Sequence, residues 1–147
     1  MAEITSQPTG SPTEQWTATP ENFNYARIDE TIAGKNTSDY VRATLLNKTD
    51  LYTFPADGPS KMKEVTEVWI NIYVNSTDAG KTPGIRVRLY AGAVIKGSRS
   101  YRVDTSGSWI VYGLRFTGLS LTRAEYNDLR VESTSIDGAG QLVPEAP

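Results

Sequence analysis

The sequence predicts an all-β fold: a single β-sandwich of jelly-roll type, with one short helix and an extended tail at each end. Two observations predict it. Apolar residues alternate with polar ones at a period of two in several short segments, and turn-forming Gly, Pro and Asn residues separate these segments. Strands do not alternate with long helices, which argues against a doubly wound sheet. A chain of 147 residues is long enough for one domain.

Composition excludes several kinds of chemistry. The chain contains neither cysteine nor histidine, which removes disulfides, structural zinc sites, thiol nucleophiles and imidazole bases. A formal net charge of −2 supplies no basic field for nucleic acid, and no apolar run is long enough to cross a membrane. The first residues lack the basic and apolar regions of a secretory signal. We expect no cofactor, no metal site, and neither nucleic acid nor a membrane as partner.

Residues 1–22 are predicted to form an N-terminal extended arm. The stretch is polar and rich in proline, and its large apolar side chains are Ile4 and Trp16. Such a segment cannot bury enough apolar surface to fold by itself. Two interpretations stay open: a disordered tail, or an arm that becomes ordered on a neighbouring subunit with Trp16 as its anchor. A lone tryptophan is costly to leave in water, which favours the second interpretation.

The β-sandwich domain is assigned to residues 23–135. Its first strands are expected over residues 23–28, 39–46 and 51–54, because β-branched and aromatic residues there are separated by turn-forming ones. The third of these strands ends at Pro55, and the Asp57-Gly58-Pro59 loop that follows cannot continue a ladder.

The segment over residues 65–92 organises the domain. It contains two runs in which aliphatic residues alternate with polar or aromatic ones, joined by a turn-rich stretch over residues 76–84. The two runs predict a long hairpin with one buried aliphatic face. That face carries Val68, Ile70, Ile72, Val74, Ile85, Val87 and Leu89, and the other face carries Trp69, Asn71, Tyr73, Arg86, Arg88 and Tyr90.

The rest of the domain is predicted as short strands and one turn of helix. Extended chain continues over residues 93–95, Gly97 bends it, and a strand follows over residues 100–103. Residues 108–116 carry large groups on both faces, which predicts a strand in the middle of its sheet. One face carries Ile110, Tyr112, Leu114 and Phe116, and the other carries Trp109, Val111 and Arg115. Thr122 and Glu125 have the spacing of a capping box, which predicts a helix over residues 123–129. A last strand is expected over residues 129–133, and residues 136–147 form the C-terminal tail.

The outer face of the predicted hairpin is the best candidate for a binding surface. Trp69 and Tyr73 point the same way, and Arg86, Arg88 and Tyr90 lie across from them if the hairpin closes in register. Three roles stay open for this face: stacking on sugar rings, a subunit interface, in which Trp, Tyr and Arg are enriched, or mutual stacking beneath a loop. Trp16 is a further interface candidate.

Other motifs do not predict catalysis. Residues 79–82 (AGKT) resemble the end of a phosphate-binding loop, but Asn75 stands where that motif needs glycine and no helix follows. Several acidic residues lie beside turn formers, where carboxylates cap turns. No spacing among them supports a calcium loop or a glycosidase pair. They are Asp29, Glu30, Asp39, Asp50, Asp57, Asp78 and Asp104. We expect no catalytic residue.

The order of segments resembles a known family. YARIDE, SDYV, DLYTF, VTEVWINIYV, IRVRLYAG and SWIVYGLRF follow one another as in small β-sandwich virion proteins of tailed bacteriophages, and LTRAEYNDLRV resembles their late turn of helix before the final strand. The resemblance covers residues 25–133 and rests on hydrophobic pattern and segment order. It departs at the end, where GAGQLVPEAP replaces the further valine-rich strand of the family.

The resemblance implies a non-enzymatic structural role in a virion. A capsid decoration (cement) protein of this kind lies on the capsid surface after synthesis in the host cytoplasm. It binds the major capsid protein and copies of itself, as a homotrimer. The alternative is a carbohydrate- or host-binding module of a phage tail.

Overall fold

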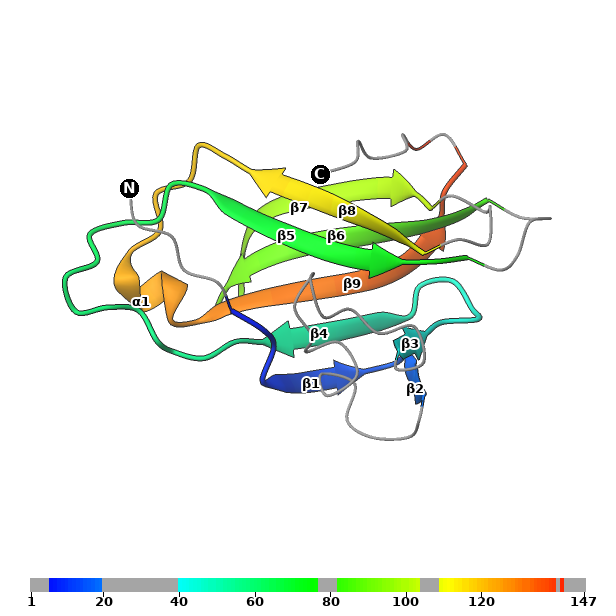
Figure 1. Cartoon of the computed structure of the whole chain (residues 1–147), viewed down its shortest axis with the longest axis horizontal. Helices are drawn as coiled ribbons and strands as arrows, with labels where there is room; N and C mark the ends of the chain where they lie inside the picture. The colour runs from blue at the N-terminus through cyan, green and yellow to red at the C-terminus, as the bar shows by residue number, and fades with distance from the viewer. Residues whose placement is uncertain (1–5, 20–39, 77–81, 104–108, 140, 142–147) are drawn as a thin grey trace.

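The computed structural model describes residues 6–19, 40–76, 82–103, 109–139 and 141. The fold is all-β with one small helix, as the sequence predicts (Figure 1). The elements are β1 (Gly10–Glu14), β2 (Thr17–Thr19), β3 (Tyr40–Arg42), β4 (Thr49–Thr53), β5 (Val68–Val74), β6 (Pro83–Ala91), β7 (Val94–Arg102), β8 (Ile110–Phe116), α1 (Arg123–Tyr126) and β9 (Leu129–Asp137).

The strands form two layers. A five-stranded sheet has the order β1-β4-β9-β6-β7, and β5 and β8 form a two-stranded sheet that lies across it (Figure 1). Strands β2 and β3 pair separately beside the larger sheet, and all of these pairings are antiparallel. The jelly-roll connectivity stays a prediction.

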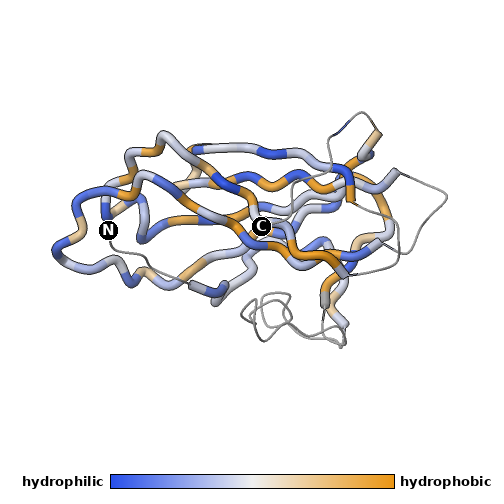
Figure 2. The backbone as a smooth tube through the Cα atoms, turned by 45° about the horizontal axis from the view of Figure 1, so that its top comes forward, coloured by the Kyte–Doolittle hydropathy of each residue, from blue (hydrophilic) through white to orange (hydrophobic). Residues whose placement is uncertain are grey.

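The core lies between the two layers. Val87 and Leu89 of β6 face Leu114 and Phe116 of β8, and all four side chains are buried. The aliphatic residues of β5 are partly buried against the same cluster. Alternation of hydrophobic and hydrophilic residues along these strands is visible in Figure 2. The buried faces predicted for residues 68–74 and 85–89 are therefore confirmed.

The predicted hairpin between residues 65–74 and 85–92 is wrong. Strand β5 pairs with β8, from Val68 opposite Phe116 to Val74 opposite Ile110, whereas β6 lies between β7 and β9. Both runs alternate in the same way because each layer buries one face, from opposite sides of the core. The period of two identifies the buried face of a strand, and it does not identify the neighbouring strand. Strand β8, predicted to be central, pairs with β5 alone among the described strands.

Residues 10–19, predicted to belong to an arm, are part of the domain. β1 pairs with β4, and Trp16 packs against the core while its indole Nε1 donates to the Lys48 carbonyl oxygen at 2.8 Å. Anchoring of Trp16 on a neighbouring subunit is therefore wrong. The physical reason is Asp50, which is fully buried and accepts hydrogen bonds from the backbone amides of Gln15 and Trp16 at 2.8 and 2.9 Å.

The predicted domain limits shift at both ends. Because β1 shares a sheet with β4 and β9, a boundary at residue 22 does not separate an arm from the domain. Strand β9 runs to Asp137, and the Gly138 amide donates to the Thr82 carbonyl at 2.7 Å, so the structure continues into the predicted tail over residues 136–147. The strand predicted over residues 23–28 lies outside the described residues.

The capping box is confirmed. The Thr122 hydroxyl accepts from the Glu125 amide at 3.2 Å, and the Glu125 carboxylate accepts from the Thr122 amide at 3.1 Å. Helix α1 ends at Tyr126, three residues before the predicted end at residue 129. It ends there because the Asn127 side chain turns to accept the Gly58 amide at 2.8 Å, and the next residues enter β9.

Gly97 lies within β7 and does not end it. A Cβ atom at this position would lie 2.3 Å from Cδ1 of Phe116, so glycine leaves the space that the buried phenylalanine occupies. The pairing of β6 with β7 is irregular between Leu89 and Tyr90, next to this position. The bend expected at Gly97 is therefore a bulge in a continuous strand.

Candidate binding surfaces

The structure separates the predicted surface into two. Trp69 and Tyr73 point outward from the two-stranded sheet, since the alternate residues of β5 face the core. Arg86, Arg88 and Tyr90 point outward from the five-stranded sheet for the same reason. The two sets therefore lie on opposite sides of the sandwich. Trp16 belongs to neither set.

The first surface, called here the aromatic face, consists of Glu67, Trp69, Tyr73, Trp109 and Arg115 on the outer side of β5 and β8. Trp69 is 52% exposed and lies opposite Arg115, whose guanidinium carbon is 5.4 Å from the indole centroid. The rings of Tyr73 and Trp109 have centroids 5.1 Å apart and an interplanar angle of 36°. Three aromatic side chains thus share one side of a narrow sheet.

Polar contacts fix the orientation of Trp69. Glu67 binds Arg115 in a bidentate manner, with Nε to Oε1 at 2.6 Å and Nη2 to Oε2 at 3.1 Å. The indole Nε1 of Trp69 donates to the same Oε1. The hydrogen bond from Arg115 is the largest cause that lowers the pKa of Glu67, and Glu67 in turn raises the pKa of Arg115. The exposed ring is therefore held between a guanidinium and a carboxylate.

The middle of the aromatic face carries no aromatic side chain. Asn71 lies opposite Gly113, which has no side chain, between the Trp69–Arg115 and Tyr73–Val111 pairs. The aromatic side chains therefore lie toward the two ends of this sheet, with the Asn71 side chain between them. Sequence reasoning placed Trp109 and Arg115 on one face of their strand. It did not join them to Trp69, because the pairing of β5 with β8 was not recognised.

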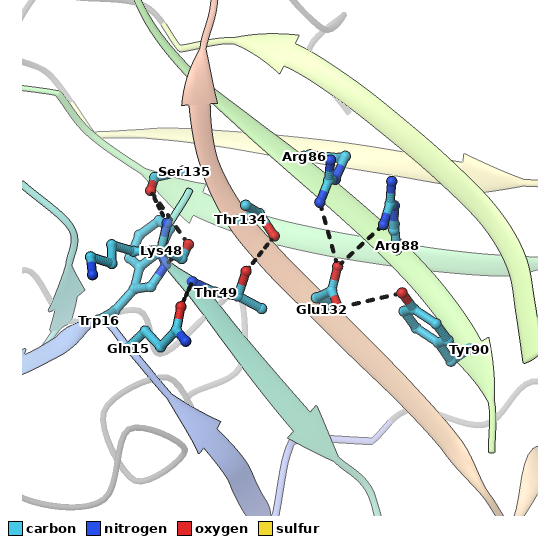
Figure 3. A network of polar contacts seen from close by, with 10 residues as sticks. All are labelled: Gln15, Trp16, Lys48, Thr49, Arg86, Arg88, Tyr90, Glu132, Thr134 and Ser135. Carbon is cyan, nitrogen blue, oxygen red and sulfur yellow. Dashed lines mark hydrogen bonds and ion pairs between the residues drawn. The ribbon is translucent and has the colours of Figure 1, made fainter. Parts of the chain in front are cut away.

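The second surface, called here the arginine face, consists of Arg86, Arg88, Tyr90, Arg130 and Glu132 on the outer side of β6 and β9. Figure 3 shows all of these residues except Arg130. Glu132 Oε1 is 3.8 Å from Nη2 of Arg86 and 3.9 Å from Nη1 of Arg88. Its other oxygen accepts from the Tyr90 hydroxyl at 3.3 Å. Arg130 lies opposite Tyr90. One carboxylate therefore serves two guanidinium groups and a hydroxyl.

Arg130 makes its own contact at the end of this surface. Its Nη2 lies 3.4 Å from Oδ1 of Asp128, two residues earlier in the chain. Neither Arg130 nor Glu132 was singled out from the sequence. The signal that identifies them is alternation within LRVEST, since Val131 of that run is buried and its two neighbours point to the opposite side.

The polar contacts continue from the arginine face toward β4. The hydroxyl groups of Thr49 and Thr134 are 2.9 Å apart. Farther along, Ser135 accepts from the Lys48 amide at 3.0 Å (Figure 3). The Ser135 hydroxyl also donates to the Leu45 carbonyl at 2.7 Å. These contacts join β9 to the segment over residues 45–49, whose Lys48 carbonyl accepts from the indole Nε1 of Trp16.

Two kinds of feature are absent from the described residues. No group of three or more acidic residues in the described ranges is arranged to hold a metal ion. None of the helices in that part of the chain is long and apolar enough to cross a membrane. Comparison with protein-family models, with curated proteins and with solved structures finds no match to this chain.

Proposed function

We propose that this protein is a non-enzymatic structural component of a bacteriophage virion, a capsid decoration protein that binds neighbouring shell subunits through its aromatic face. The observation that carries the proposal is Trp69, half exposed and held in one orientation by Arg115 and Glu67. Tryptophan and arginine are the residues most enriched in the energetically dominant parts of protein interfaces. The family resemblance over residues 25–133 supports the same role.

The energetics favour attachment in many copies. A tryptophan side chain buries about 200 Å² in an interface. Covering the exposed half of Trp69 contributes about 2–3 kcal/mol in gross terms at about 25 cal/mol per Å². Association costs more than this for a single contact. Attachment therefore requires further contacts with the major capsid protein and with other copies of this chain in a homotrimer. It also requires avidity, which arises because the contacts are repeated over the shell.

The experiment compares attachment of wild-type protein and Trp69→Ala to capsids that lack this protein, by co-sedimentation. The variant should bind at least tenfold more weakly, because it loses the rigid centre of the surface. Ile95→Ala is the matched control, since Ile95 is 50% exposed and lies outside the aromatic face. Equal binding of all three proteins, or absence of the chain from purified virions, would overturn the proposal.

The second candidate function is a carbohydrate- or host-binding module of a phage tail. The observation that favours it is the set of three rings on one side of a narrow sheet, with the exposed amide side chain of Asn71 between them. Aromatic rings stack on the apolar faces of sugars. A glycan array probed with wild-type protein and Trp69→Ala distinguishes the two functions. Saturable sugar binding that the variant loses would support the module and replace the decoration role.

A further inference from the structure

We propose that the arginine face is a second binding surface, and that its ligand is an extended acidic segment of a partner protein. The surface lies on the side of the sandwich opposite the aromatic face, so this inference does not rest on the proposed function. The binding groups are the guanidinium groups of Arg86 and Arg88, with the Ser98 and Ser100 positions beside them.

The arginine face carries an excess of positive charge although the whole chain has a formal net charge of −2. Arg86 and Arg88 share a single oxygen of Glu132, at 3.8 and 3.9 Å. A full charge-assisted hydrogen bond has a donor–acceptor distance of about 2.7–2.9 Å. Glu132 therefore compensates the two guanidinium groups incompletely, and the pair retains the capacity to bind another carboxylate.

The carboxylate that compensates the charge of Arg86 and Arg88 lies on the β9 side of β6. On the β9 side, Arg86 lies opposite Thr134 and Arg88 lies opposite Glu132. On the β7 side, the same two arginines lie opposite Ser100 and Ser98. The β7 side thus offers two hydroxyl groups and no carboxylate at these cross-strand positions. A ligand on that side meets the guanidinium groups without displacing Glu132.

Hydrogen bonding within the protein leaves donors of these side chains unused. The Nε atoms of Arg86, Arg88 and Arg130 are buried and have no hydrogen-bond partner in the described part of the chain. Because buried polar atoms of native proteins are nearly always paired, the hydrogen bonding of these three guanidinium groups is incomplete within the described residues. The side chains of Arg86 and Arg88 are each 30% exposed, so the donors that a ligand can reach are the terminal nitrogens.

The spacing of the two arginines identifies the ligand as an extended peptide. Residues two apart on a strand are separated by about 7 Å. Acidic residues at alternate positions of an extended segment have the same separation, so two carboxylates can meet Arg86 and Arg88 together. A nucleic acid is a poorer ligand, because its binding needs a basic field much wider than two arginines, and a chain of net charge −2 does not supply one.

The experiment measures fluorescence anisotropy of a labelled peptide of four Glu-Thr repeats with the full chain at low salt. We expect saturable binding that becomes at least tenfold weaker in the double variant Arg86→Gln/Arg88→Gln. Glu132→Gln should bind at least threefold more tightly, because it removes the competing carboxylate. Arg42→Gln is the control for loss of one positive charge outside this surface, on β3, and should bind as the wild type does.

The opposite effects of the two kinds of variant separate binding from stability. If the ion pairs serve folding alone, both variants on the surface lower the melting temperature and neither alters peptide binding selectively, which would overturn the proposal. Absence of saturable peptide binding would do the same. A dT12 oligonucleotide that binds more tightly than the peptide would show a nucleic-acid site and would also overturn it.

Discussion

Asp50 shows how one buried residue determines the path of the N-terminal segment. Sequence reasoning assigned it to a turn because Asn47, Lys48 and Thr49 precede it. In the structure it has no exposed surface, and its carboxylate accepts from two backbone amides and from the Tyr52 hydroxyl at 2.6 Å. The burial of an aspartate depends on donors that arrive from distant parts of the chain. Such donors leave no local pattern in the sequence.

Asp50→Ala should lower the free energy of unfolding by about 2–4 kcal/mol, because it leaves three donors without their acceptor. Asp57→Ala is the matched control. Asp57 also accepts from a tyrosine hydroxyl, that of Tyr126 at 2.9 Å, but it is exposed. We expect a loss below about 1 kcal/mol for the control. Urea unfolding followed by tryptophan fluorescence measures both, and equal losses would contradict this role of Asp50.

Because of Tyr52, the stability of the folded protein should depend on pH in the alkaline range. Burial, with a further contribution from Asp50, raises the pKa of its hydroxyl well above the ordinary value of 10.0. A raised pKa in the folded state means that this contribution to stability is complete below pH 10 and is lost as the pH rises further. The melting temperature of the wild type should fall steeply above about pH 10.

The comparison for Tyr52 is Tyr52→Phe. This variant melts at a lower temperature at neutral pH, because Asp50 loses one donor, but its melting temperature should fall less steeply above about pH 10. Parallel curves for the two proteins would show that Tyr52 does not carry the alkaline effect.

At the scale of elements, the sequence predicted which residues are buried but not which strands are neighbours. Ile70 and Val87 were correctly placed on buried faces, since alternation reports the side of a strand that meets the core. Their strands were wrongly paired with each other. Pairing is determined by contacts between distant segments, such as β4 with β9, and by the packing of whole layers. The capping box at Thr122 was found because it is local.

The contact of β7 with β8 is sensitive to one methyl group. Gly97→Ala places a Cβ atom against the buried ring of Phe116, and should lower the free energy of unfolding by about 2 kcal/mol. Gly10→Ala is the control in β1, where the nearest atom is the hydroxyl oxygen of Thr53, on a side chain that can rotate. Thermal unfolding by circular dichroism compares the two. A variant at Gly97 as stable as the one at Gly10 would contradict the close packing of Phe116.

At the scale of the whole molecule, the candidate surface could be predicted only in part. Five of the six candidate residues do lie on outer faces of strands, as alternation indicated, but they divide between two sides because β5 and β6 belong to different layers. The sixth, Trp16, is held within its own chain. A polar, proline-rich composition correctly indicates that residues 1–22 cannot fold alone, and it gives no information on the sheet that receives them.

Deletion of residues 1–16 should destabilise the whole domain. It removes β1 and Trp16 and leaves Asp50 without two of its donors, so we expect a loss of about 3 kcal/mol or more. Trp16→Phe keeps β1 and loses the indole hydrogen bond to Lys48, with an expected loss of about 1 kcal/mol. Differential scanning calorimetry measures both. A truncated chain that melts like the wild type would restore the interpretation of these residues as a separate arm.

The aromatic face and the arginine face lie on opposite sides of the sandwich, with the hydrophobic core between them. Packed sheets are about 10 Å apart, so two different ligands can be held on either side without meeting. Binding of a ligand on one face neither blocks nor requires binding on the other face. The two binding free energies should therefore add. If both proposed surfaces bind their ligands, we expect the molecule to link an acidic segment on one side to the protein that covers Trp69 on the other.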